Sequence, residues 1–243
     1  DFLMKVISSD IKDLFIIEPS IYVDQRGFFL ESWNQQQFNQ AINQEITFVQ
    51  DNHSHSGKGT LRGLHYQLKH PQGKLVRVVM GNVLDVAVDL RRSSPTFGAH
   101  VTVELTAENH RQLWIPVGCA HGFVVLSEYA DFLYKTTESY VPEDEYCIQY
   151  NDPDLNIDWR IDGIHPILSK KDKELTEQSE KIKKLNSTEA ELEKLKRKFN
   201  EVDSNTELEI QKRLSEELNK VKNREESKYE LKEKELQKKL DDY

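Results

Sequence analysis

The amino-acid composition changes abruptly after Pro166, and this change constrains the fold more strongly than any other feature of the sequence. Every Gly, Pro, His, Trp and Cys residue of the 243-residue chain lies at or before Pro166. Turns between strands depend on Gly and Pro, whereas a segment rich in Lys, Glu and Leu without them is typical of a long helix. We therefore predict a compact domain over residues 1–172 and a helical extension over residues 173–243.

The first part has the sequence pattern of many short β-strands. Residues 84–90 alternate large apolar side chains with small or acidic ones, as in a half-buried strand, and Gly81-Asn82 predicts a turn before them. Only residues 35–43 predict a short helix. Further strand patterns lie at residues 100–105, 112–116, 121–127 and 131–137. Evenly spaced strands predict a mainly β fold, a sandwich or a jelly-roll barrel, and leave open whether Asp85 and Asp89 face a pocket or water.

The second part has apolar residues at helical spacing. They form an a/d seam that slips in phase and is interrupted by charged residues further along the chain. Motifs that begin at Thr188 and Ser204 match capping boxes, so we expect new helix starts there and about three helical pieces in all. Two interpretations stay open, a solvated helical extension and an oligomerising coiled coil. The sequence also leaves open whether the extension is straight or folded back as a hairpin.

Charge and cysteine content exclude several classes of protein. The formal net charge is −9. Because acids and bases nearly cancel in the extension, most of this charge lies on the compact domain, which argues against a nucleic-acid surface. Cys119 and Cys147 give neither a disulfide framework nor the spacing of a zinc site. No apolar run is long enough to span a membrane, and the first residues do not resemble a signal peptide. We expect a cytoplasmic protein.

The segment TLRGLHYQ (residues 60–67) holds the first candidate for acid–base chemistry. A neutral imidazole such as that of His65 is a suitable general base near neutral pH, although a lone strand histidine is more often structural. Strict alternation places Arg62 and His65 on opposite faces of a strand. A β-bulge at Gly63 would bring both into one pocket. Otherwise one of them serves a neighbouring subunit.

Two further residues fit proton transfer on an anionic substrate. Tyr134 is the candidate acid, and its structural alternative is a core tyrosine with a satisfied hydroxyl. Lys74 would stabilise a developing oxyanion, and its structural alternative is a solvated turn lysine. A single base, a single acid and nearby cations on β-patterned segments therefore indicate an enzyme that moves protons.

A metal site has weaker support. His53 and His55 form an H-x-H pair, a spacing that β-barrel metal sites often use. However, residues 57–59 read GKG where such sites usually carry a glutamate. We therefore expect no metal and no cofactor, and we interpret residues 52–54 as part of a polar substrate loop.

Ten segments of the first part closely resemble one family. In chain order they are DQRGFF (24–29), FVQDNHS (48–54), LRGLHYQ (61–67), QGKLVR (72–77), DVAVD (85–89), SPTFG (94–98), QLWIP (112–116), AHGF (120–123), FLYK (132–135) and LSKKD (168–172). Together they resemble the dTDP-4-dehydrorhamnose 3,5-epimerase family, whose fold is a cupin-type jelly-roll barrel. The resemblance covers nearly all of residues 4–172. Cys119 stands where an aromatic residue is commoner, and the extension has no counterpart in the family's usual short ending.

The resemblance implies a metal-free isomerase that acts on dTDP-4-dehydro-6-deoxy-D-glucose in nucleotide-sugar (dTDP-rhamnose) biosynthesis. C3 and C5 of this sugar flank the C4 ketone, so loss of either proton gives an enolate. By family position His65 is the base and Asp172 its orienting partner. Tyr134 returns a proton to the opposite face, and Lys74 lies near O4, where negative charge develops.

The resemblance also implies a nucleotide site and a homodimer. Phe28 would stack on thymine, from the partner subunit if the dimer exchanges strands, and arginine forks suit the diphosphate. The other positions that contact nucleotide and sugar in the family fall on Arg26, Glu31, Gln50, Asp51, Asn52, Arg62, His121, Glu145 and Lys171.

Other functions stay open beside this one. A single-site epimerase, acting at C3 or C5 alone, shares the His, Lys and Tyr residues, although FLYK (132–135) fits the bifunctional type. A non-catalytic protein would bind a nucleotide sugar and assemble through its extension. The intact set His65, Lys74, Tyr134 and Asp172 argues against that alternative. The extension is also a candidate for further assembly or for binding a partner.

Overall fold

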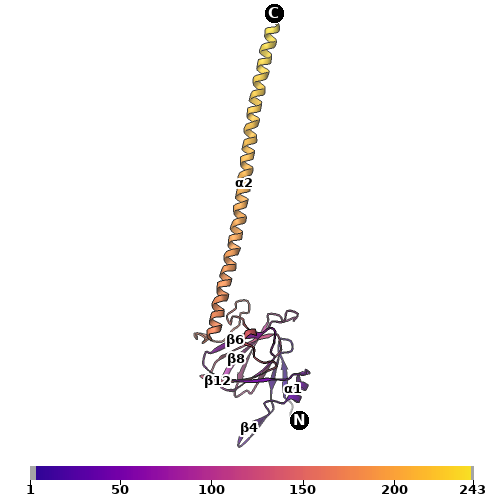
Figure 1. The fold of residues 1–243 in the computed structure, drawn as a ribbon, viewed down its shortest axis with the longest axis vertical. Coiled ribbons are helices and arrows are strands. Elements are labelled where there is room, and N and C mark those ends of the chain that lie inside the picture. Colours follow the sequence, from indigo (N-terminus) through magenta and orange to yellow (C-terminus); the bar gives the residue numbers. More distant parts are fainter. Residues whose placement is uncertain (1–3, 242–243) are drawn as a thin grey trace. The chain divides into compact units, whose positions relative to one another are not determined.

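The computed structural model describes the backbone of residues 4–241 and divides the chain into two compact units, Asp1–Ser179 and Glu180–Tyr243. Within the long C-terminal helix it describes the side chains of residues 170–174, 177, 181, 184–199, 206 and 208–228. The first unit is mainly β (Figure 1). No helix in the described part of the chain combines the length and apolarity that crossing a bilayer requires.

Two antiparallel sheets build the first unit. One contains, in spatial order, β1 (Lys5–Ser8), β2 (Phe15–Glu18), β10 (Gln112–Ile115), β7 (Lys74–Met80), β12 (Tyr129–Thr136) and β5 (Gln50–Gly57). The other contains β13 (Glu145–Cys147), β6 (Leu61–Gln67), β11 (Cys119–Val125), β8 (Asn82–Asp89) and β9 (His100–Thr106). Most successive strands from β5 to β13 alternate between the sheets, which is the connectivity of a jelly roll. The predicted mainly β, cupin-type fold is confirmed.

The space between the sheets is apolar at its centre. Its cluster of buried side chains includes Val76 of β7, Phe132 of β12 and Phe123 of β11, and the last two rings stack with centroids 4.1 Å apart. A second cluster covers the outer face of the β6-β11-β8 sheet, where Trp159 and other residues of the chain after β13 pack. Because β8 is therefore buried on both faces, Asp85 and Asp89 do not face water.

The short helix and the turns follow the sequence pattern. Helix α1 (Gln35–Ile42) begins after Asn34, whose side chain accepts a hydrogen bond from the backbone N–H of Gln37 at 3.1 Å. It ends at Asn43, which has a left-handed conformation with φ of 54°. A turn at Gly81 separates β7 from β8. These predictions are confirmed. A 3₁₀ helix (Pro142–Asp144) precedes β13, and β3 (Ile21–Asp24) with β4 (Gly27–Leu30) forms a separate hairpin.

A bulge interrupts the pairing of β6 with β11. His65 lies opposite His121, and Arg62 lies opposite Phe123, so two residues of β6 face one residue of β11 between these pairs. Opposite residues of a ladder project to the same face, so Arg62 and His65 share the face between the sheets. The predicted bulge at Gly63 is confirmed.

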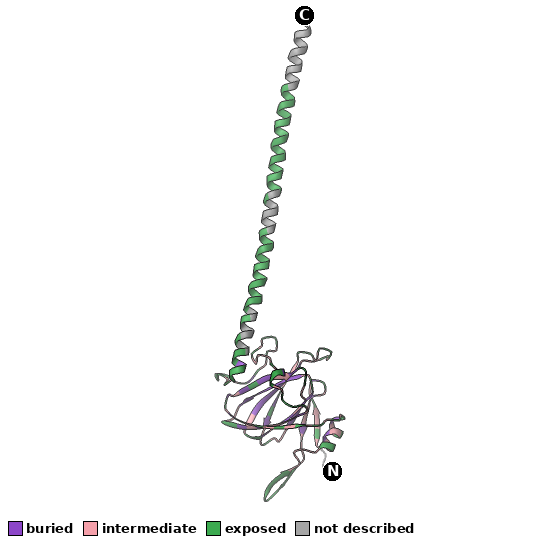
Figure 2. Cartoon of the chain, viewed as in Figure 1, coloured by how far each residue is buried: buried purple, intermediate pink, exposed green. Residues whose placement is uncertain are grey.

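The C-terminal helix α2 (Lys170–Asp241) is continuous, so the prediction of about three helical pieces is wrong. Thr188 does not cap a new helix, because its hydroxyl donates to the backbone carbonyl of Lys184, one turn earlier, at 2.8 Å. The backbone is also helical at Ser204. The described side chains of residues 184–199 are exposed (Figure 2). A solvated helix and a coiled coil both stay predictions for this segment.

We predict that Gly63→Ala destabilises the barrel far more than Gly98→Ala. Both glycines have positive φ, of +121° and +80°. A Cβ at Gly63 would lie 2.5 Å from the Cα of Gly122, whereas a Cβ at Gly98 meets no atom within 4 Å. Both variants carry the strain of a positive φ, and the steric overlap at Gly63 should lower the free energy of unfolding by about a further 1–3 kcal/mol. Urea denaturation measures the difference, and equal midpoints would contradict the close strand approach.

Candidate active site

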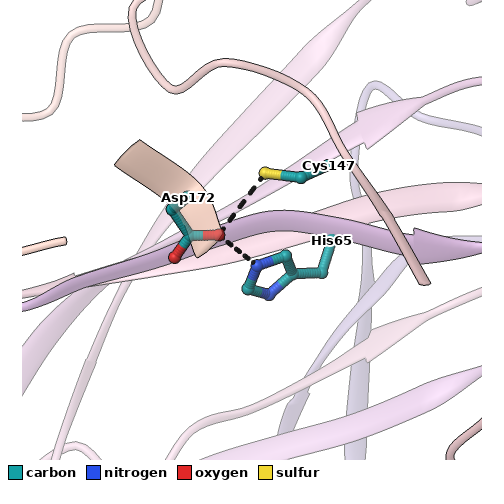
Figure 3. A group of neighbouring side chains, drawn as sticks. All are labelled: His65, Cys147 and Asp172. Carbon is teal, nitrogen blue, oxygen red and sulfur yellow. Dashed lines mark hydrogen bonds and ion pairs between the residues drawn. The ribbon is translucent and has the colours of Figure 1, made fainter. Parts of the chain in front are cut away.

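His65 and Asp172 form a hydrogen-bonded pair between β6 and the first turn of α2 (Figure 3). The Nε2 atom of His65 lies 2.8 Å from Oδ1 of Asp172, and the hydroxyl of Ser169 donates to Oδ2 at 2.8 Å. Burial alone would raise the pKa of Asp172, but the hydrogen bonds from His65 and Ser169 outweigh it and lower the pKa. An ionised carboxylate accepts hydrogen bonds only, so the proton sits on Nε2. The Nδ1 atom of His65 then carries the lone pair and points away from Asp172.

Two neighbours of Asp172 were not predicted from the sequence. Ser169 caps α2, since it accepts a hydrogen bond from the backbone N–H of Asp172 at 3.1 Å. The S-x-x-D spacing of these two residues was an available signal. Cys147 has its Sγ 3.7 Å from Oδ1 of Asp172 and 3.3 Å from the carbonyl of Ile148. Only the pairing of β13 with β6, which the sequence pattern does not reveal, places Cys147 opposite His65.

A second histidine–carboxylate pair lies beside the first. The Nε2 atom of His121 lies 3.0 Å from both carboxylate oxygens of Asp85, and both side chains are buried. Burial lowers the pKa of His121 even though Asp85 acts in the opposite direction. The charges of Lys74 and His65 also act on His121, so these groups share one electrostatic environment.

Lys74 and Tyr134 supply a cation and a neutral acid on the opposite sheet. Lys74 projects to the same face of β7 as Val76, toward the space between the sheets. Burial lowers the pKa of Lys74 to about 8, although the charges of Glu145 and Asp85 act against this change. Tyr134 shares a face of β12 with Phe132, and burial raises the pKa of its phenol. Tyr134 therefore keeps its proton at neutral pH.

Polar side chains of β5 line the same space. The guanidinium of Arg62 donates to Oγ of Ser56 at 3.2 and 3.3 Å. Asn52 lies opposite Tyr134 in the β5–β12 ladder and accepts from Gln50 at 2.8 Å. The buried Nδ2 of Asn52 has no hydrogen-bond partner among the described residues. A buried donor without a partner is costly, so this amide suits an acceptor oxygen of a ligand.

An acidic residue and a lysine complete the rim. Oε2 of Glu145 accepts hydrogen bonds from Lys171 at 2.5 Å and from the hydroxyl of Tyr140 at 3.1 Å. Burial would raise the pKa of Glu145, but the Lys171 hydrogen bond and the charge of His65 lower it. The predicted residues Glu145 and Lys171 therefore lie together, near His65.

Other predicted site residues lie elsewhere in the chain. The hairpin projects away from the strands that carry the histidines (Figure 1). There Arg26 pairs with Asp24, and Phe28 is 60% exposed. Asp51 is on the outer face of β5, paired with Lys135 at 2.6 Å. The remaining predicted residue, Glu31, accepts a hydrogen bond from Asn34 at 2.7 Å.

The predicted substrate loop at residues 52–54 is wrong, because these residues belong to strand β5. Alternation along this strand sends Asn52 between the sheets and His53 to the outer face. His53 and His55 both contact Oδ1 of Asp131 there, at 3.2 and 2.8 Å. His53 and His55 are thus on the outer face of their sheet, whereas His65 lies on the face between the two sheets.

Comparison of the chain with known proteins matches most of its length to one family. A sequence profile described as dTDP-4-dehydrorhamnose 3,5-epimerase matches residues 8–180. The chain is 58% identical over 171 residues to the dTDP-4-dehydrorhamnose 3,5-epimerase of Pseudomonas aeruginosa, covering 70% of this chain and 94% of that protein.

Two solved structures extend the comparison. The dTDP-6-deoxy-D-glucose-3,5-epimerase of Legionella pneumophila, in complex with dTDP-4-keto-L-rhamnose, is 55% identical with a TM-score of 0.68, covering 70% of this chain and 90% of that one. A 3'-monoepimerase of Streptomyces bikiniensis, in complex with dTDP-quinovose, is 34% identical with a TM-score of 0.64, covering 68% and 84%. From the matching profile and the extent of these identities, the chain belongs to the dTDP-4-dehydrorhamnose 3,5-epimerase family.

Proposed function

We propose that this chain epimerises C3 and C5 of dTDP-4-dehydro-6-deoxy-D-glucose, giving dTDP-4-dehydro-L-rhamnose for dTDP-rhamnose biosynthesis. The observation that carries the proposal is the His65–Asp172 pair, which leaves Nδ1 of His65 as a base in the same enclosure as a protonated Tyr134. Two solved relatives hold dTDP sugars, dTDP-4-keto-L-rhamnose and dTDP-quinovose, which are the class of ligand that this site would take.

The proposed chemistry uses each of these groups once per inverted centre. Nδ1 of His65 removes the proton from the carbon beside the C4 ketone, and Nε2 remains bonded to Asp172. The electrons delocalise onto O4 as an enolate, which the ammonium of Lys74 stabilises as charge develops. Tyr134 then gives its proton to the opposite face of the same carbon, so the centre inverts. His65 then releases the abstracted proton to solvent and Tyr134 regains one, so a second cycle at the other carbon completes the conversion.

A second copy of the chain would complete the nucleotide site. An isolated two-stranded hairpin is marginally stable, yet β3 and β4 expose Tyr22, Val23, Phe28 and Phe29, at 44–77% exposure. We propose that this hairpin packs on a second copy in a homodimer, where Phe28 would stack on thymine and Arg26 would contact the diphosphate.

The unpaired thiols of Cys119 and Cys147 suit a reducing cytoplasm.

The deciding test is turnover of dTDP-4-dehydro-6-deoxy-D-glucose in D2O, followed by NMR. We expect deuterium at both C3 and C5, with the L-rhamno product trapped by a reductase. Label at one carbon would instead identify a single-site epimerase, the function of the Streptomyces bikiniensis relative. Absence of label with dTDP still bound would identify a non-catalytic binding protein.

The same assay separates base from acid. His65→Ala should lower both exchange and turnover by about 100- to 10,000-fold while dTDP binding persists. Tyr134→Phe should impair inversion more than exchange, because the base remains. Tyr129→Phe, on the exposed end of β12, is the matched control. Equal loss of exchange and inversion in Tyr134→Phe would remove Tyr134 from the role of acid.

Activity should also fall as pH rises through about 8, where Lys74 loses its proton. The ammonium is present below this pH and lost above it, so stabilisation of O4 disappears on the alkaline side. Tyr134 does not account for such a limb, because burial raises the pKa of its phenol. In Lys74→Arg the cation persists, and the alkaline limb of kcat/KM should move to higher pH. The surface control Lys5→Arg should leave the alkaline limb where it is. If Lys74→Arg also leaves the limb unchanged, the limb belongs to a group other than Lys74.

Disrupting the hairpin should weaken the dimer. Val23 is 77% exposed in the single chain, and Val23→Asp would place a charge in the proposed interface. We expect the dimer dissociation constant, measured by analytical ultracentrifugation, to rise at least about tenfold. Phe97→Asp changes an exposed aromatic residue outside the hairpin and should have little effect. An unchanged dimer in Val23→Asp would contradict packing through the hairpin.

A further inference from the structure

Three side chains that meet at the start of α2 have the donor atoms of a zinc site (Figure 3). One ligand atom each from His65, Cys147 and Asp172 lie within 4.8 Å of one another. The nitrogen–oxygen distance is 2.8 Å and the sulfur–oxygen distance 3.7 Å. Tetrahedral zinc with bonds of about 2.0–2.3 Å holds its ligand atoms about 3.3–3.8 Å apart. Small side-chain adjustments would therefore accommodate the ion.

The backbone fixes the three donors independently of any ion. Cys147 lies opposite His65 in the β13–β6 ladder. Asp172 is in the helical turn capped by Ser169, which also bonds its second carboxylate oxygen. The side chain of His65 is 27% exposed, so an ion can reach the three ligand atoms from solvent. Among the described residues, no other group of three or more His, Cys, Asp or Glu side chains has its ligand atoms within 4.8 Å of one another.

The local charge favours a cation. The carboxylate of Asp172 lies 3.7 Å from Sγ of Cys147, and Glu145 shares a face of β13 with Cys147. These carboxylates attract a divalent cation, and a bound dication in turn favours the deprotonated sulfur. Three protein ligands of nitrogen, sulfur and oxygen, with a fourth position for water, suit zinc.

We propose that His65, Cys147 and Asp172 bind a thiophilic divalent cation such as Zn²⁺, and that the bound ion stops epimerisation. Zinc takes the Nε2 lone pair, the Cys147 sulfur and an Asp172 oxygen, and the thiol proton leaves to solvent. The proton on Nε2 leaves to solvent as zinc binds, and Nδ1 takes one up, so the neutral imidazole now carries its proton on Nδ1. The nitrogen that removes the sugar proton is then blocked. This second half of the proposal rests on the proposed role of His65.

The outer face of β5 offers a competing place for an ion. His53 and His55 both contact Asp131 there, and none of the three carries sulfur. A cation bound at that face would leave both Cys147 and the tautomer of His65 unchanged. Sulfur ligation therefore distinguishes the two sites.

The test is titration of the reduced, full-length protein with Cd²⁺, the spectroscopic substitute for Zn²⁺. Thiolate ligation gives an ultraviolet sulfur-to-cadmium charge-transfer band. We expect this band to saturate at a single ion per chain, to disappear on addition of Zn²⁺, and to be lost in Cys147→Ala. Cys119→Ala is the matched control, because Cys119 is the other free thiol and lies buried among apolar residues. It should retain the band.

Activity measurements test the second half. Zn²⁺ should abolish turnover reversibly, with recovery after chelation and with dTDP binding unchanged. Relative to its own metal-free rate, Cys147→Ala should need at least about tenfold more Zn²⁺ for the same inhibition. Absence of the band, or its persistence in Cys147→Ala, would overturn the site even if the chain proves not to be an epimerase. A saturated band without inhibition would overturn the blocking of the base and count against His65 in that role.

Discussion

The hydrogen bond between His65 and Asp172 is the interaction on which the site depends. It joins a strand of the barrel to the first turn of α2 and fixes which imidazole nitrogen holds the proton. The Ser169 hydroxyl bonds the second oxygen of the same carboxylate, so the cap of the helix and the orientation of the base are one arrangement. A helix start that shifted by one residue would move Asp172 around the helix axis and away from β6. The proposed chemistry therefore depends on how α2 begins.

The barrel tolerates polar groups at its centre and rim because most of them are paired. Asp85 is held by His121, and Glu145 by Lys171 and Tyr140. An exception is Nδ2 of Asn52, which has no partner among the described residues and marks where a ligand would supply an acceptor. Paired groups give rigidity, and an unsatisfied donor would bind an acceptor oxygen of a ligand.

Much of this arrangement could be predicted from the sequence, because periodicity and turn residues are local signals. They indicated the strands β6 to β12, α1, the Gly81 turn and the bulge at Gly63, but not β1 to β5. The contacts that β13 makes are not local. A three-residue strand has no readable period, so nothing indicated that Cys147 faces His65. The capping motif at Thr188 failed because a threonine hydroxyl also bonds a carbonyl inside a helix. Asp51 and Asn52 are neighbours in sequence, and only the ladder register shows that they face opposite ways.

The same carboxylate explains why a proton and a cation would compete at this site. Without an ion, Oδ1 of Asp172 accepts hydrogen bonds from Nε2 of His65 and from the thiol of Cys147. A cation must displace the thiol proton before the sulfur can bind it. The field that orients the base thus attracts metal ions, while the thiol's hold on its proton limits their access. Cys147→Ala would remove both the sulfur ligand and the thiol proton that a cation must displace.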